Sequence, residues 1–264
     1  DFDGDGFLEF FNKSGLSVNG LKLLSHFNGD QKFGKIELVS SGFNELIEVN
    51  YASISNENDN CEGLYHPEYS GVYPLIDFHK PIHVVSNLNF PDGSGLNKYT
   101  SNRVNQRYFY KYAKMHMQGK GFMGFREVEF DEQQNNDIHG TVLRNHSEFE
   151  IDQQYYFNRL IKSHKTIVEY GSFDPEVRDF PCYSEIVYSK NLSSSENTYS
   201  TIRLSNNRFI NQLDYTIKGD NLIGTKSEVN YFYNGINSSI HGNPSSIVQT
   251  IASGSANPET IVKE

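Results

Sequence analysis

The sequence predicts an all-β protein in which antiparallel hairpins form a curved or spiralling sheet. Aromatic residues make up 14% of its 264 residues, with 17 Tyr and 19 Phe but no Trp, and such residues favour pleated, half-buried strands. The 21 glycines supply turns, and few segments show the spacing of an amphipathic helix. The length is enough for one large or two modest domains with a hydrophobic core.

An acidic loop, DFDGDGFLE, opens the sequence. Carboxylates recur at every second position and Gly6 allows a sharp bend, which is how a short loop surrounds a hard cation with oxygen ligands. An EF-hand would need a bidentate Glu at position twelve, where Asn12 stands instead. We therefore predict a calcium site followed by a strand at 7–12, and the alternative is an acidic turn that binds nothing. The predicted calcium ligands are Asp1, Asp3, Asp5, the backbone carbonyl of Phe7, and Glu9.

Short apolar segments predict the next strands. Residues 20–27 form one strand, and residues 35–41 and 45–53 form a hairpin around Gly42-Phe43-Asn44. Residues 55–71 are rich in Asn, Glu, Gly and Ser and predict a loop. The expected core residues of the hairpin are Ile36, Leu38, Ile47, Val49 and Tyr51.

Residues 74–90 predict a further strand, which runs through Val84 and Val85. His79 and His83 share one face of such a strand, but residues four apart lie about 13 Å from each other there. No metal-binding motif surrounds them. We interpret them as ordinary surface or packed histidines.

Residues 107–131 alternate in character and predict a long β-hairpin with two partly apolar faces. Its turn lies at 118–121, where two glycines allow positive φ, and its second strand lies at 125–130. A sheet with two apolar faces must be covered on both sides or curl until it covers itself. One face of the first strand is expected to carry Tyr108, Tyr110 and Tyr112.

The same hairpin contains Gly119-x-Gly121-x-x-Gly124, which matches the dinucleotide-binding fingerprint. That fingerprint works only between a strand and a helix N-terminus, where backbone N–H groups meet the pyrophosphate. Here the third glycine leads into Phe-Arg-Glu-Val-Glu-Phe, a second strand. We interpret these glycines as turn residues.

The second half of the chain predicts more strands after a polar turn at 133–137. Residues 158–170 could form a helix, although their β-branched side chains favour a strand. Ser and Asn residues at 190–198 predict a loop. The other strands are expected at 141–150, 182–188, 199–205, 208–218 and 226–233.

Charge and composition exclude several classes of protein. The net charge of -10, without a basic cluster, argues against nucleic-acid binding because phosphates would be repelled. No apolar segment is long enough to cross a bilayer, and no signal peptide is present. Cys61 and Cys182 are far apart in the sequence, and we interpret them as two separate buried thiols rather than a disulfide.

Several motifs occur in an order that resembles Rhs/YD-repeat proteins, a family that includes the B and C components of insecticidal toxin complexes. The acidic loop resembles the calcium loops of FG-GAP/VCBS propeller blades, and Pro-Ile-x-Val-Val at 81–85 resembles a strand of the family's central region. Gln-Gly-Lys-Gly-Phe-x-Gly-Phe at 118–125 resembles the hairpin of the same region. The tail, with YFYN at 231–234 and GNPSSI at 242–247, resembles a YD repeat, although Asn234 replaces the usual Asp and the spacing to Gly242 is longer.

The resemblance implies three regions and a function. Residues 1–14 would end a calcium-binding repeat, 15–229 would form the central β region, and 230–264 would begin a YD-like repeat. The chain would be a non-catalytic segment of a secreted or surface-exposed bacterial toxin, in which a β strip spirals into a hollow shell around a toxic C-terminal polypeptide. Its partners would be the rest of its own longer chain: a propeller upstream, and YD repeats and payload downstream. The start on Asp1, inside a motif, also predicts a piece of a longer protein.

Two other functions remain open from the residues alone. A binding module would use the tyrosines of the central hairpin as a stacking surface for glycans or a cell-surface receptor. An enzyme would need paired carboxylates, and Glu127 and Glu129 share a strand face about 7 Å apart, within the range that glycoside hydrolysis uses. Acidic residues on a solvated strand face are far commoner than such a pair.

Overall fold

The structure is a computed structural model in which every described element is a β-strand. It describes residues 10–13, 21–24, 36, 38–40, 46–55, 63–91, 103–134, 141–170, 186–204, 208–233, 243–253 and 259–263. Over these residues there is no helix that could span a membrane. The predicted all-β fold is therefore confirmed, including residues 158–170, which form a strand and not a helix.

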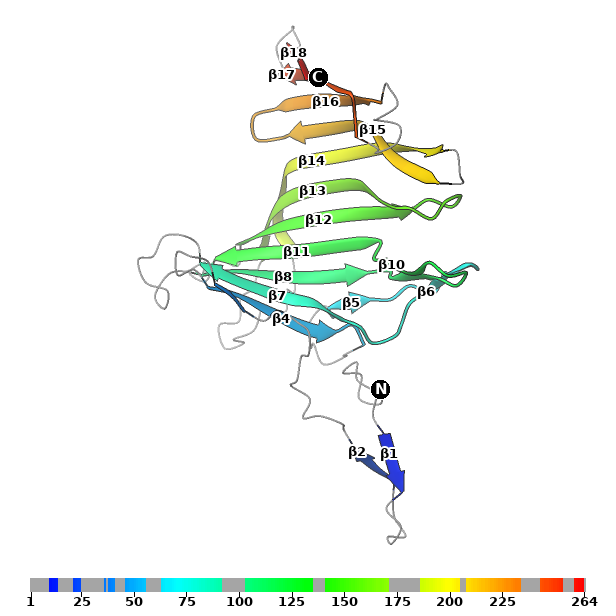
Figure 1. Cartoon of the computed structure of the whole chain (residues 1–264). Helices are drawn as coiled ribbons and strands as arrows, with labels where there is room; N and C mark the ends of the chain where they lie inside the picture. Colours follow the sequence, from blue (N-terminus) through cyan, green and yellow to red (C-terminus); the bar gives the residue numbers. More distant parts are fainter. Residues whose placement is uncertain are drawn as a thin grey trace.

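A single 13-stranded sheet contains most of the described residues (Figure 1). From β11 onward each strand pairs antiparallel with the next along the chain, so this half is an uninterrupted meander. The main path consists of β3 (Leu38–Ser40), β4 (Leu46–Ser53), β7 (His83–Pro91), β8 (Arg103–Lys111), β11 (Glu127–Gln134), β12 (Thr141–Ile151), β13 (Asn158–Tyr170), β14 (Ile186–Arg203), β15 (Phe209–Asp220), β16 (Thr225–Phe232), β17 (Ser246–Ser253) and β18 (Glu259–Lys263).

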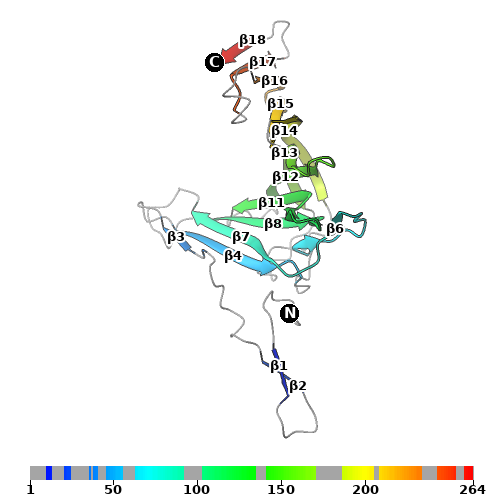
Figure 2. The same ribbon diagram turned by 45° about the vertical axis from the view of Figure 1, so that its right-hand side comes forward.

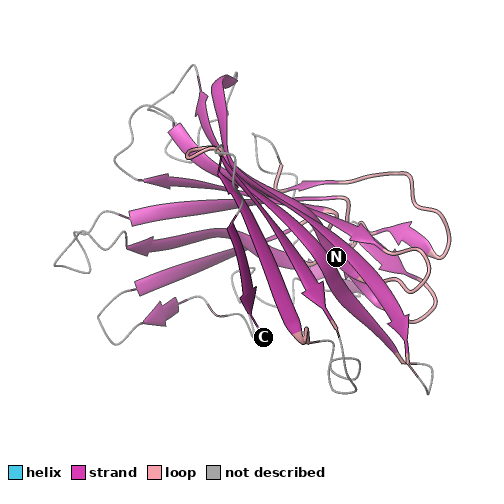
Figure 3. Ribbon diagram, turned by 90° about the horizontal axis from the view of Figure 1, so that it is seen from above, coloured by secondary structure: helices cyan, strands magenta, loops and turns pink. Residues whose placement is uncertain are grey.

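The sheet twists strongly along its length. In Figure 2 the strands near β7 and β8 are seen along their length, while the strands from β12 upward are seen nearly end-on. Seen from above, the strands fan out around a common region (Figure 3). This is the accumulated right-handed twist expected of a wide open sheet, and it agrees with the predicted curved or spiralling arrangement.

A small three-stranded sheet covers one end of β8. It consists of β6 (Leu75–Asp77), β9 (Lys114–His116) and β10 (Gly121–Gly124), while β5 (Tyr65–His66) pairs parallel with β8. Between these elements Ile54, Phe78 and Ala113 form a buried cluster. Tyr65, Met115 and Phe125 are among the partly buried side chains that pack against it.

A separate hairpin consists of β1 (Phe10–Lys13) and β2 (Leu21–Leu24), which pair antiparallel. These strands overlap the segments predicted at 7–12 and 20–27. The hairpin predicted at 35–41 and 45–53 corresponds to β3 and β4.

Three sequence-based expectations are corrected. The strand at 107–111 pairs with 127–131 as predicted, but residues 114–124 leave the hairpin to join the small sheet, because a break after β8 redirects the chain. The predicted loop at 190–198 is the middle of β14, whose backbone pairs with a strand on each side. Ile36 and Leu38 are not core: they are 63% and 54% exposed, because Ile36 lies before β3 and Leu38 lies in β3, which pairs only with β4 among the described strands.

Candidate functional site

The register of the central strands places two neighbouring histidines on one face of the sheet and a row of three serines on the other. Glu129, His146, His164 and Ser194 lie directly opposite one another on β11 to β14, and opposite residues share a face. We call this the histidine face. Their neighbours in sequence, Ser147, Ser163 and Ser195, are also opposite one another and define the serine face.

The turn between β12 and β13 fixes this register. The Asp152 carboxylate accepts a hydrogen bond from the Tyr155 backbone N–H at 2.9 Å, and the Asp152 N–H donates to the Phe157 carbonyl at 2.9 Å. Tyr156 adopts a positive φ of 57° within the turn. The tight turn aligns His146 with His164, since a slip by one residue would send one imidazole to the opposite face.

A chain of charged and polar contacts crosses the histidine face. The Lys111 Nζ lies 3.3 Å from Glu127 and 3.0 Å from Glu129. The His146 ring bridges two carboxylates, with Nδ1 2.7 Å from Glu129 Oε1 and Nε2 3.3 Å from Glu148 Oε1. The His164 ring stacks on His146, with ring centroids 4.6 Å apart. We call Glu129, His146, Glu148 and His164 the His–Glu cluster.

The environment of the cluster shifts the pKa of its members in different directions. Burial would raise the pKa of Glu129, but hydrogen bonds from His146 and Lys111 outweigh it and lower the pKa to about 2. The Glu129 hydrogen bond raises the pKa of His146 against the opposing effect of burial. Burial lowers the pKa of His164, and the nearby His146 lowers it further. At neutral pH Glu129 is therefore an anion and His164 a neutral imidazole.

A buried ion pair lies beside the cluster on the same face. The Asp131 side chain has no exposed surface, and Arg144 donates from Nε and Nη2 to its two oxygens at 2.8 Å each. This two-pronged geometry satisfies a carboxylate that would otherwise be buried without a partner. Asp131 is thus structural, and its bonds to β12 hold β11 in place.

Two groups of side chains could hold a metal ion among the described residues. One is His146, Glu148 and His164, and the other is Glu127, Glu129 and His146; within each group the ligand atoms lie within 4.8 Å of one another. The first offers two imidazoles and a carboxylate, which suit a divalent transition metal.

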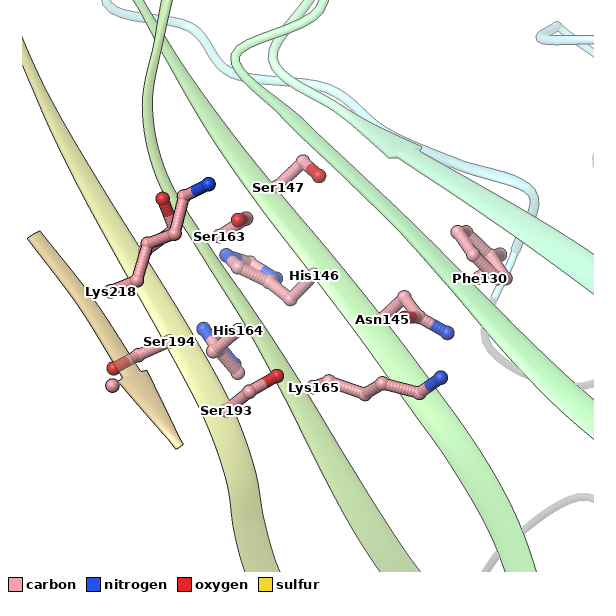
Figure 4. A pocket seen from close by; sticks show the side chains of 12 residues that line it. Phe130, Asn145, His146, Ser147, Ser163, His164, Lys165, Ser193, Ser194 and Lys218 are labelled. Atoms are coloured by element: carbon pink, nitrogen blue, oxygen red, sulfur yellow. The ribbon is translucent and has the colours of Figure 1, made fainter. Parts of the chain in front are cut away.

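A shallow hollow of about 390 Å³ lies over β11 to β15 (Figure 4). Serine and glycine make up half of its lining residues, and His146 and His164 of the His–Glu cluster line it as well. Lys165 and Lys218 flank it, and the other residues that line it include Phe130, Asn145, Ser147, Ser163, Ser193 and Ser195.

The predicted calcium ligands Asp1, Asp3, Asp5, Phe7 and Glu9 lie outside the described residues, so calcium binding stays a prediction. Cys61 and Cys182 also lie outside them.

The three tyrosines of the central hairpin do not form the expected stacking surface. Tyr108 and Tyr110 do stack, with centroids 6.4 Å apart, but Tyr110 is only 9% exposed and its hydroxyl donates to the Val85 carbonyl. Tyr112 lies after the end of β8 with a φ of 59°. Gly119 and Gly121 have positive φ at the predicted turn, and Gly124 is followed by a strand, so the fingerprint match is a turn.

Glu127 and Glu129 share a face, as the alternation predicts, but both bind Lys111. A glycosidase acid needs a raised pKa, whereas the pKa of Glu129 is lowered. Sequence reasoning missed His146 and His164, which lie on different strands. One part of the cluster was predictable from the sequence. His146 and Glu148 are two residues apart, and this spacing in a strand places both side chains on one face.

No protein-family model matches the chain, and no curated protein matches it. Similar solved structures include the crystal structure of TcdB2-TccC3-Cdc42, with 10% sequence identity and a TM-score of 0.45 over 78% of this chain and 12% of that chain. They also include the Photorhabdus luminescens Tc holotoxin pore with a mutation in TccC3, with 11% identity and a TM-score of 0.33 over 78% of this chain and 14% of that chain. These structural neighbours are Tc toxin components, and the chain spans less than a sixth of the length of each.

Proposed function

We propose that this chain is a non-catalytic wall segment of a larger β shell, of the kind that encloses a toxic polypeptide in Rhs/YD-repeat proteins. The observation that carries the proposal is the open, strongly twisted meander, which has an apolar, unpaired strand at each edge among the described residues. The order of family-like motifs in the sequence supports it independently.

The two edge strands expose apolar side chains, and each pairs with one strand only among the described residues. Leu38 and Val39 on β3 are 54% and 43% exposed, and Ile261 and Val262 on β18 are 42% and 57% exposed. An unpaired edge with exposed apolar side chains is a template for pairing with another strand. Both edges therefore suit a sheet that continues in each direction within a longer polypeptide.

The two faces of the meander also suit a wall. The small three-stranded sheet lies beside the end of β8, away from β15 to β18 (Figures 1 and 2). One face carries the His–Glu cluster, and the other carries Ser147, Ser163 and Ser195 opposite one another on β12 to β14. A wall that separates an interior from an exterior presents different chemistry on its two sides.

The proposal includes the calcium loop and the division of the chain. Asp1 to Glu9 would bind calcium at the end of a propeller-type repeat, the central β region would form wall, and the tail would begin the YD-like repeats. Such a protein would be secreted or displayed at the surface of a bacterium, with the rest of its own chain as the main partner.

Cysteine labelling in the full-length protein tests the wall. Ser189 and Lys190 are neighbouring exposed residues of β14 that lie opposite Val168 and Ile167, so they face opposite sides of the sheet. In a background without Cys61 and Cys182, Ser189→Cys and Lys190→Cys would be treated with a maleimide that carries a bulky polyethylene glycol chain.

A closed shell predicts that one of these cysteines reacts and the other does not until the protein is unfolded. In the 264-residue chain alone both should react at similar rates, which is the matched control. Equal reactivity of both positions in the folded full-length protein would contradict the wall proposal and favour an exposed module.

A further inference from the structure

We infer that His146, Glu148 and His164 form a binding site for a divalent transition metal ion of the Zn²⁺ class, with Glu129 as the carboxylate that orients His146. The site joins β12 to β13 in the middle of the histidine face. It is separate from the predicted calcium loop, whose ligands would all be oxygens.

The orientation of His146 is the first argument. Its Nδ1 lies 2.7 Å from Glu129, and an ionised carboxylate only accepts hydrogen bonds, so Nδ1 must carry the proton. In the neutral ring this leaves Nε2 as the atom that can donate a lone pair, so a metal would displace any proton from that nitrogen. A histidine whose second nitrogen is bound by a carboxylate is the usual arrangement of a metal ligand in proteins.

The spacing of the ligand atoms is the second argument. Metal–nitrogen and metal–oxygen distances of about 2.0–2.1 Å in a tetrahedral site require neighbouring ligand atoms to be about 3.3–3.4 Å apart. The His146 Nε2 and Glu148 Oε1 atoms are 3.3 Å apart, so two corners of the tetrahedron already stand at the required separation.

The third ligand stands on the neighbouring strand. The His164 ligand atom lies within 4.8 Å of the other two, so a shift of at most about 1.5 Å would bring it to the tetrahedral distance. Its ring stacks beside His146, as the two labelled imidazoles in Figure 4 show.

Lys111 decides between the two candidate groups. Its ammonium group already lies between Glu127 and Glu129, at 3.3 and 3.0 Å, so a metal bound there would be repelled or would have to displace it. In the other group, no lysine or arginine among the described residues forms an ion pair with Glu148: Lys162, which lies opposite it on β13, pairs with Glu196 at 4.0 Å. With three protein ligands the fourth position is open to water.

The test is a zinc titration of the 264-residue protein after chelation and removal of any affinity tag, followed by calorimetry. We expect one Zn²⁺ per chain, unaffected by millimolar Ca²⁺ or Mg²⁺, and an intense tetrahedral absorption spectrum when Co²⁺ replaces it. His164→Gln should abolish binding, and Glu129→Gln should weaken it by about 10- to 100-fold because His146 loses its orientation.

Matched variants keep the test decisive. His164→Gln is the main variant because this ring lies in partly exposed surroundings, and circular dichroism would verify that the sheet remains folded. His79→Gln removes an exposed histidine far from the cluster, and Glu127→Gln alters the competing group; both should bind zinc as the unmodified protein does. The inference would be overturned if zinc still bound after His164→Gln, or if the metal-free protein bound no zinc. The His–Glu cluster would then be only a set of hydrogen bonds and ion pairs between strands.

Discussion

Replacing Asp131 with alanine should destabilise the sheet more than any other single truncation of a charged residue on the histidine face. Asp131→Ala leaves the Arg144 guanidinium without the two 2.8 Å hydrogen bonds that now satisfy it. Removal of one partner from a buried ion pair costs about 3–5 kcal/mol. Because Arg144 is 19% exposed and water can reach part of it, we expect the lower end, about 3 kcal/mol.

Urea denaturation followed by circular dichroism measures this loss as a lower transition midpoint at unchanged slope. In a thermal scan the same loss lowers Tm by roughly 6–12 °C for a protein of this size. Glu196→Ala is the matched control, because the Lys162–Glu196 pair is exposed and 4.0 Å apart, and its removal should cost less than about 1 kcal/mol. A cost below about 1 kcal/mol for Asp131→Ala would refute the role given to this pair.

Three further predictions concern packing, backbone conformation and pH. Val142→Ala should cost about 2 kcal/mol in urea denaturation because this side chain is 1% exposed, whereas Val187→Ala, at a site 66% exposed, should change stability by less than about 0.5 kcal/mol. Gly124→Ala should lower Tm, because φ is 93° there and the new Cβ would lie 2.8 Å from the Asn158 side chain; an unchanged Tm would show that the loop adapts. Burial raises the pKa of Tyr110, so this hydroxyl stays neutral in the folded state while the unfolded state ionises near pH 10. Stability should therefore fall as pH rises above 10, and Tyr110→Phe should fall less steeply in stability measurements across that range.

The sequence was sufficient for the elements whose local pattern agrees with their environment. Alternating side chains at 141–150 and β-branched residues at 158–170 predicted strands, and both form long strands of the meander. Gly119 and Gly121 predicted the turn because glycine adopts positive φ without steric cost, and both residues have positive φ.

Local pattern failed where pairing with neighbours decides the structure. The Ser- and Asn-rich residues 190–198 carry little intrinsic preference for a strand, yet β14 lies between β13 and β15 and gains backbone hydrogen bonds on both sides. Ile36 and Leu38 have core-like side chains, but their position at an edge leaves them exposed. The burial of an apolar side chain therefore depends on the position of its strand in the sheet, which the local sequence does not give.

The His–Glu cluster could not be assembled from sequence for the same reason. His146 and His164 are 18 residues apart, and they meet because the Asp152 turn sets the register between their strands. Glu129 joins them through the separate pairing of β11 with β12. The register depends on how two strands pair, so the residue pattern of one strand alone does not predict which residues will lie opposite each other.

The most direct test of the wall proposal is a cryo-electron microscopy structure of the full-length protein that contains this chain. Our account predicts that β3 and β18 both pair through backbone hydrogen bonds with strands from other parts of the same polypeptide, and that one face of the meander lines an enclosed cavity. A sheet that ends in solvent at either edge, with both faces open to solvent, would contradict it.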